Sequence, residues 1–343
     1  MSGLKKGFLK SRDGSFAPAL AVAMVPLVAA VGMVSDYSRG TAERTSMQSA
    51  LDAASLSIMT MSKDTAKADR QKALQAAYVL NGGNGTATLG DFDITADGTS
   101  TMTSSASYAM PTDFMSMAGI NTVAISVAAA ARKNPALVEA AFKINKVSGY
   151  WNKTMTLYGV EFGETDPKPL MQITYEYNGN GGSKGYGTTT VYTPNKNGKL
   201  KTVQQQQKCT SASSWDSVPA GSFVDGNRLV TCTFTKGDGT GATIDVSQMN
   251  TMYLEMNVPS GNPKLLKTND PATSDRLYID GVESPANKTV DIFSAVPCGN
   301  TSTQAWEDGG NAVPAPVSNA DFFYDVTGKC NFSQRPSEVA LTR

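Results

Sequence analysis

Four carboxylates near the end of the chain have the types and spacing that could hold a metal ion. Glu307 and Asp308 precede a Gly-Gly pair, and Asp321 and Asp325 enclose the run Phe-Phe-Tyr. Hard oxygen ligands on a flexible loop suit Ca²⁺, and soft-metal ligands are absent from this region. We therefore take Glu307, Asp308, Asp321 and Asp325 as calcium candidates. Solvated surface acids are the more ordinary interpretation of the same residues.

The chain of 343 residues contains no histidine, and this excludes several classes of enzyme. Ser-His-Asp and Cys-His hydrolases and imidazole-bearing zinc or iron sites all require that side chain. No pair of carboxylates has a motif around it that favours acid/base catalysis, and no Ser-x-x-Lys motif lies on an expected helix. We expect a protein that is not an enzyme and requires no cofactor. A glycosidase-like enzyme is a distant alternative.

The cysteines indicate disulfides rather than metal or redox chemistry. No two of them have CxxC spacing, and an exported domain exposes them to oxidation. Four cysteines allow three pairings, and the sequence does not choose among them, although pairing the first two and the last two closes the shortest loops. The candidates are Cys209, Cys232, Cys298 and Cys330.

The charge of the chain is balanced overall but divided unevenly along it. Thirty basic residues offset thirty acidic ones, whereas residues 209–343 carry 9 basic and 15 acidic side chains. No run of Lys or Arg is longer than two residues. A nucleic-acid-binding protein would concentrate basic residues on one face, so we expect no nucleic-acid partner.

An uncharged apolar segment of twenty residues lies close to the start of the chain. Residues 16–35 read FAPALAVAMVPLVAAVGMVS and would span about 30 Å as a helix, which matches a bilayer core. Four basic residues precede this segment against one acidic residue, so the positive-inside rule places the basic tail, residues 1–15, in the cytoplasm. We expect a retained transmembrane helix with the rest of the chain outside. A cleavable signal peptide is the alternative.

Helical patterns follow the apolar segment and then give way to strands. Thr41–Met61 carries a helical stripe that continues the first helix, and Asp64–Leu80 is a second helix that ends at an Asn-Gly-Gly cluster. Three extended segments follow, Thr86–Ile94, Thr99–Ala109 and Thr122–Ala130, with a short helix before the last. These elements predict an α+β module over residues 36–132, followed by a linker over residues 133–150.

Residues 151–343 have the composition of an antiparallel β-sandwich. Short runs rich in Tyr, Thr and Val alternate with Gly and Pro, without a helical pattern between them, and we expect a jelly-roll-like sandwich. Trp151, Trp215 and Trp306 are expected in its core, with a carbohydrate-stacking platform as the alternative. The nine expected strands are Met155–Phe162, Leu170–Tyr177, Thr188–Tyr192, Arg228–Phe234, Thr243–Val246, Met252–Val258, Arg276–Ile279, Lys288–Phe293 and Asp321–Val326.

Three groups of residues in the first third of the chain resemble a known family. They are Ser11-Arg12-Asp13-Gly14-Ser15 before the apolar segment, Asp36-Tyr37-Ser38-Arg39-Gly40 after it, and the run MQSALDAASL that begins at Met47. With Tyr108–Ile120 and Val123–Ala131, they resemble the TadE/TadG-like proteins of Flp/Tad pilus assembly over about residues 8–132. The resemblance implies a single-pass bacterial inner-membrane protein with its body in the periplasm or at the cell surface. Its partners would be other Tad pilus or pseudopilin-like subunits.

Two departures from relatives of this type limit what the resemblance implies. If Gly14 were the cleavage glycine of a prepilin, Ala19 would stand where a Glu is usual, so we expect neither cleavage nor bulk polymerisation. Many TadG proteins continue into a von Willebrand A domain, whose metal site begins with Asp-x-Ser-x-Ser. Lys146 and Tyr150 stand at the Asp and second Ser positions here, so we expect no intact domain of that kind and no such metal site.

The end of the chain offers an alternative function. Residues 306–310 and 321–326 resemble the acidic ending of exported β-sandwich adhesion domains, which implies that the carboxylates named above hold calcium. The leading hypothesis is a non-enzymatic component of Flp/Tad pilus biogenesis that presents a β-sandwich outside the cytoplasm. The alternative is a membrane-anchored adhesin that binds glycan or a calcium-dependent partner.

Overall fold

The computed structural model describes most of the chain and divides it into two compact units. Its described residues run from 16 to 342, except 179–184, 213–217, 221, 226–227, 238, 297, 310–311, 314 and 336–337. The N-terminal unit comprises Met1–Thr95, Thr99–Asn134 and Pro336–Arg343, and the distal unit comprises Ala96–Gly98 and Pro135–Arg335. The end of the chain therefore belongs to the first unit, and nearly all of the distal unit is inserted before the last strand.

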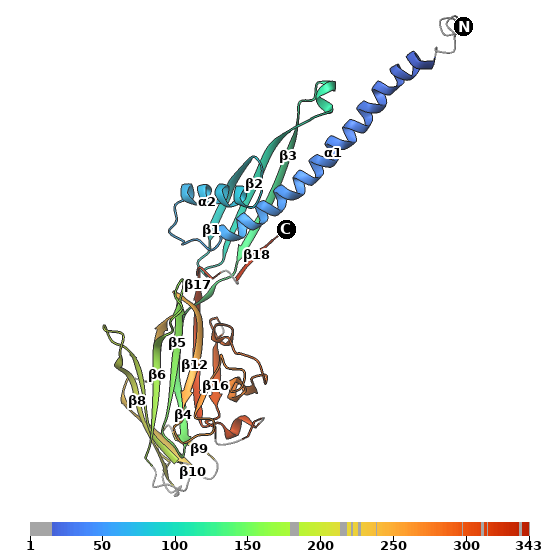
Figure 1. The fold of residues 1–343 in the computed structure, drawn as a ribbon. Helices are drawn as coiled ribbons and strands as arrows, with labels where there is room; N and C mark the ends of the chain where they lie inside the picture. The colour runs from blue at the N-terminus through green and yellow to red at the C-terminus, as the bar shows by residue number, and fades with distance from the viewer. Residues whose placement is uncertain are drawn as a thin grey trace, which may run out of the picture. The chain divides into compact units, whose positions relative to one another are not determined.

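The N-terminal unit is built on one long helix. Helix α1 (Phe16–Ile58) runs for 43 residues through Pro26, which confirms that the apolar segment and the following stripe form one continuous helix. Its C-terminal half packs against α2 (Lys67–Leu80) and a sheet (Figure 1). The buried Arg70 side chain donates a hydrogen bond of 3.3 Å to the Ile58 carbonyl at the end of α1 and stacks over Phe92.

Four antiparallel strands form the sheet of this unit. Their order is β1 (Thr86–Ile94), β2 (Ser100–Pro111), β3 (Thr122–Lys133) and β18 (Val339–Leu341). Alternate residues of β2 and β3 are buried under α1, as period-two burial requires, whereas the residues between them are exposed. The loop between β2 and β3 contains the short helix η2 (Met115–Ala118), which confirms the helix expected there. The core includes Met47, Leu51, Ala54 and Ile58 of α1 with Leu74 and Tyr78 of α2.

The part of the distal unit that the structure describes is a curled antiparallel sheet of fourteen strands. Strands β12 (Met249–Asn257), β5 (Lys153–Glu161), β6 (Lys168–Tyr177) and β7 (Gly185–Pro194) form one arm. Strands β4 (Ala136–Gly149), β17 (Phe322–Asn331), β16 (Thr301–Trp306) and β14 (Leu277–Ile279) form the other. Both arms bury side chains in one core, with Met155, Leu157 and Ile173 from the first and Phe142, Phe322 and Trp306 from the second. The antiparallel sandwich-like organisation is confirmed in this coarse form.

The remaining strands of the distal unit complete this sheet. Their bounds are β8 (Leu200–Ala212), β9 (Phe223–Asp225), β10 (Arg228–Lys236), β11 (Ala242–Asp245), β13 (Leu265–Lys267) and β15 (Val282–Glu283).

Two expectations about this unit were wrong. Residues 136–149, expected in a linker, form β4, which pairs with β17, β11 and β7. The segment Lys288–Phe293, expected as a strand, instead leads into the short helix α3 (Ile292–Ala295). The Asp291 side chain caps that helix by accepting a hydrogen bond from the Phe293 N–H, a role that favours helix over strand.

All four cysteines form disulfides. Cys209 pairs with Cys232 across β8 and β10, and Cys298 pairs with Cys330 of β17. These are the two shortest-loop pairings that the sequence left open.

Candidate functional site

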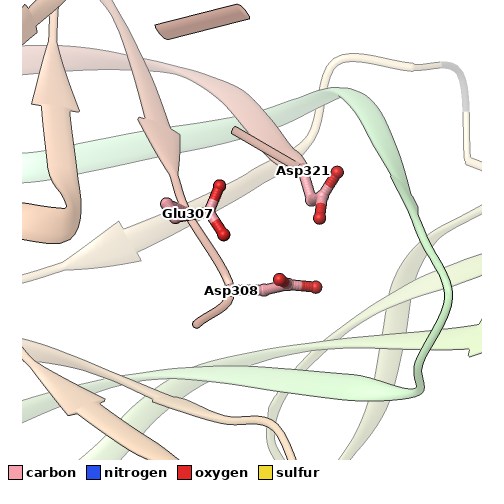
Figure 2. A group of neighbouring side chains, drawn as sticks. All are labelled: Glu307, Asp308 and Asp321. Carbon is pink, nitrogen blue, oxygen red and sulfur yellow. The ribbon is translucent and has the colours of Figure 1, made fainter. Parts of the chain in front are cut away.

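Three of the four predicted calcium candidates meet in the distal unit. Glu307 and Asp308 directly follow β16, and Asp321 directly precedes β17. The pairing of Trp306 with Phe322 in this hairpin brings the two ends together, so that carboxylate oxygens of the three residues lie within 4.8 Å of one another (Figure 2). All three residues are buried. Asp325 is not part of this cluster, because it lies further along β17 and accepts a hydrogen bond from Thr303.

A lysine that the sequence did not single out lies inside this acidic cluster. The Lys153 side chain, at the start of β5, has no exposed surface, and its Nζ donates to Asp308 Oδ2 and to the Ser148 carbonyl oxygen, the latter at 3.0 Å. Its Nζ also lies 3.7 Å from Asp321 Oδ2. Buried charges must be paired, and this ammonium supplies the positive charge that two of the carboxylates require.

The backbone around the cluster is shaped to admit the lysine. Gly149, at the end of β4, has a φ of 131°, and a Cβ at this position would lie 2.7 Å from Lys153 Nζ. A larger residue would therefore be strained and would push the ammonium away.

The buried ring of Tyr175 lies 5.6 Å from Lys153 Nζ. Burial, with the nearby Asp321 charge as a further cause, raises the pKa of Tyr175, so this ring stays neutral.

The donor set suits Ca²⁺ poorly while Lys153 is in place. Ca²⁺ takes six to eight oxygen ligands, and here the ammonium already occupies the cation position beside Asp308 and Asp321. A divalent ion would have to displace it. The cluster is therefore best described as a buried ion-pair network that joins β5 to the β16–β17 hairpin, and calcium binding stays a prediction.

Two other residue groups raised by the sequence have structural roles or lie outside the described residues. Trp306 is fully buried in the distal core and Trp151 packs against it, as expected for core residues, while Trp215 lies outside the described residues. Lys146, at the Asp position of the von Willebrand A motif, lies in β4, and its Nζ is 2.9 Å from Asp225 Oδ1.

The second candidate site is the N-terminal half of α1, where large apolar side chains are exposed. Val31, for example, is 72% exposed. Figure 1 shows this half of α1 continuing beyond the sheet of its own unit. Within the described residues, no helix is both long enough and apolar enough to cross a membrane, so the expected transmembrane span over residues 16–35 is not confirmed. The exposed set comprises Leu20, Val22, Met24, Leu27, Val28, Val31, Met33 and Val34.

Asp36 lies in the first part of α1 that packs against the rest of its unit, one turn after Gly32. Although it is an aspartate, it is only 3% exposed, because its carboxylate accepts hydrogen bonds from three consecutive backbone N–H groups in the β2–β3 loop. These are Asp113 at 3.2 Å, Phe114 at 2.9 Å and Met115 at 2.7 Å. The hydrogen bond from Met115 is the main cause that holds the pKa of Asp36 below its ordinary value, and the carboxylate is therefore charged at neutral pH.

A groove lies between α1 and β3, beside the hydrogen bonds that join Asp36 to the β2–β3 loop. Its volume is about 570 Å³, and its lining is mostly apolar on both sides. Met33, Val34 and Tyr37 contribute from α1, and Val123 and Ile125 from β3. The sequence showed the apolar residues of α1, but it contained no signal that residues 113–115 would bind Asp36.

Comparison with known proteins identifies the part of the chain that contains this second site. Residues 14–57 match the family model described as "Putative Flp pilus-assembly TadE/G-like". This match coincides almost entirely with α1 and is shorter than the resemblance expected over residues 8–132. Neither the curated proteins nor the solved structures give a match to the chain. The segment that forms the long N-terminal helix of this chain is thus similar to the TadE/G-like Flp pilus-assembly family.

Proposed function

We propose that this protein is a non-enzymatic component of Flp/Tad pilus biogenesis, held in the bacterial inner membrane by the N-terminal half of α1. The distal unit is presented on the outer side, in the periplasm or at the cell surface, with the N-terminus in the cytoplasm. The observation that carries the proposal is that the family match covers α1, whose first half exposes large apolar side chains.

Three further features support this arrangement. Residues 16–35 contain no charge, and the basic residues before them favour a cytoplasmic N-terminus. Both disulfides lie in the distal unit, which fits an oxidising compartment. The acidic cluster is neutralised in part by Lys153, as in a structural network, so a non-catalytic scaffold accounts for it.

Deletion of the gene with complementation tests the role in assembly. Cells that lack the protein should lose surface pili, counted by electron microscopy, and the wild-type chain should restore them. If the deleted cells assemble pili normally and only fail to attach, the assembly role is wrong and the adhesin alternative stands.

Charged substitutions in α1 test which surface carries the function. Val28→Asp with Val31→Asp places two charges in the exposed apolar half of α1, and it should fail to restore pili. Val79→Asp with Leu80→Asp is the matched control, because these two residues are also exposed and apolar but lie at the end of α2. Full complementation by the α1 variant would contradict the proposal.

A further inference from the structure

We propose that the β2–β3 loop, residues 112–121, is a second lipid-contacting element that enters the bilayer interface beside α1. The proposal rests on the proposed anchoring of α1 and adds a surface that the family match does not cover. The partner is the lipid bilayer itself. Figure 1 shows the loop at the tip of the β2–β3 hairpin, which extends along α1.

The loop is fixed at a defined height on α1. A Cβ at Gly32 would lie 2.5 Å from the Phe114 side chain, so the absence of a side chain at Gly32 lets the loop pack directly on the helix. One turn further along, Asp36 binds three backbone N–H groups of the loop. The uncharged segment of α1 ends at Ser35. If residues 16–35 span the bilayer core, residues 32–36 lie at its interface, and the loop lies there with them.

The surface that the loop presents at this height is apolar. Met117 is 68% exposed, Ile120 is 43% exposed and Phe114 is 40% exposed. No charged residue occurs between Phe114 and Ala131. Large exposed apolar residues on a short segment without charge, here residues 114–121, are unusual for a surface in water and typical of segments that insert into the interface.

A charged pair involves a residue that lies further along α1 than the apolar segment. Arg39 and Asp113 form an exposed ion pair with a distance of 2.7 Å between Nη1 and Oδ2. Tyr37, which is 72% exposed, lies between the apolar segment and this pair, and tyrosines are enriched at membrane interfaces. Along α1, the apolar segment comes first, Tyr37 follows next to the loop, and Arg39 of the ion pair comes last. This order is typical of an element that lies at a membrane interface.

The distribution of exposed residues on α1 favours lipid over a single protein partner. At 100° per residue, Leu27 and Val31 lie on one side of the helix, whereas Val22 and Met33 lie on nearly the opposite side, and all four are exposed. One packed helix would cover one stripe only, but lipid contacts a helix from every open side. The loop is continuous with this surface through the contact of Phe114 with Gly32.

Photocrosslinking from single positions of the full chain tests the proposal. Met117, Leu27 or Thr101 is replaced by p-benzoylphenylalanine, and each chain is reconstituted in vesicles of palmitoyl-oleoyl phosphatidylcholine. Thr101 is the matched control, because it is exposed on β2 but lies ten residues before Pro111 at the loop end of that strand. After irradiation, mass spectrometry of the digested chain detects lipid adducts at each position.

The proposal predicts lipid adducts at Leu27 and Met117 and none at Thr101. Adducts at Leu27 without adducts at Met117 would overturn this inference and leave the proposed anchoring intact. An absence of adducts at both positions would overturn the anchoring and the inference with it. Crosslinks from Met117 to a second copy of the chain in place of lipid would show that the loop is a protein interface and would also overturn the inference.

Discussion

The backbone N–H of Met115 donates a hydrogen bond of 2.7 Å to the side chain of Asp36, which lies 79 positions earlier in the sequence. With the N–H groups of Asp113 and Phe114, this contact ties the β2–β3 loop to α1 where the helix begins to pack. A buried aspartate in the middle of a helix is thereby explained, because its charge is satisfied chiefly by backbone donors.

Replacement of Asp36 should loosen the β2–β3 loop. In Asp36→Asn, one carboxylate oxygen becomes an amide NH₂ that cannot accept, so at least one of the three loop N–H groups loses its acceptor. Hydrogen exchange should become faster at residues 113–115. The matched control is Asp113→Asn, which removes only an exposed ion pair with Arg39 and should change exchange little. Equal protection of residues 113–115 from hydrogen exchange in Asp36→Asn and the wild type would show that Asp36 does not hold the loop.

The same contact predicts a pH dependence. The pKa of Asp36 is lowered in the folded protein, so its contribution to stability is present above the ordinary pKa of an aspartate and is lost as the pH falls through the folded pKa. Loop protection should therefore persist from neutral pH to about pH 4 and fall only below it. Asp36→Asn should lack this acid transition, and a transition of unchanged size in that variant would assign it to another group.

The sequence predicted the elements around this contact but not the contact itself. Helical periodicity identified α1 and α2, and alternation with turn residues identified β1, β2 and β3, because these are local patterns. The pairing of Asp36 with residues 113–115 depends on how the hairpin returns to the helix. A non-local contact of this kind leaves no periodic signal in one sequence.

Removal of the buried ammonium should destabilise the distal unit. Lys153→Met leaves Asp308 and Asp321 without that partner, and loss of one member of a buried ion pair costs about 3–5 kcal/mol of unfolding free energy. All three tryptophans belong to the distal unit, so denaturant unfolding followed by tryptophan fluorescence reports on this unit. Lys329→Met, which breaks an exposed pair with Glu139, should cost less than about 1 kcal/mol.

Calorimetry with the wild type and Asp308→Asn tests the calcium prediction. If Lys153 supplies the cation of the cluster, calorimetry should show no Ca²⁺ binding to the wild type. Ca²⁺ binding by the wild type that Asp308→Asn abolishes would show that a metal displaces the lysine. Equal stability of Lys153→Met and the wild type would show that the network is not a stabilising element.

The distal unit shows why the acidic cluster was predicted only in part. Glu307, Asp308 and Asp321 are conspicuous as acids, and the β16–β17 hairpin brings them together through a local pairing. Lys153 precedes this group by more than 150 residues, and only the curling of the sheet brings β5 to it. The return of β18 to the N-terminal unit was missed for the same reason, since three residues carry no pattern that assigns them to a distant sheet.

The disulfides should contribute to the stability of the distal unit. The pair Cys298–Cys330 closes a separation of 32 residues, and in the loop-entropy view its removal costs about 3–4 kcal/mol. The double variant Cys298→Ser with Cys330→Ser should therefore unfold at lower denaturant concentration than the wild type. Alkylation of the unreduced wild-type protein should label none of the four cysteines. Labelling of all four would show that neither disulfide forms in the cell.

Alkaline carbonate extraction of membranes from cells that express the full chain tests the central claim most directly. Carbonate removes peripheral proteins and leaves helices that are embedded in the bilayer, so the wild-type chain should remain in the membrane pellet. The variant Val28→Asp with Val31→Asp should shift to the supernatant, whereas Val79→Asp with Leu80→Asp should remain in the pellet. Release of the wild-type chain by carbonate would contradict the claim that the N-terminal half of α1 anchors this protein.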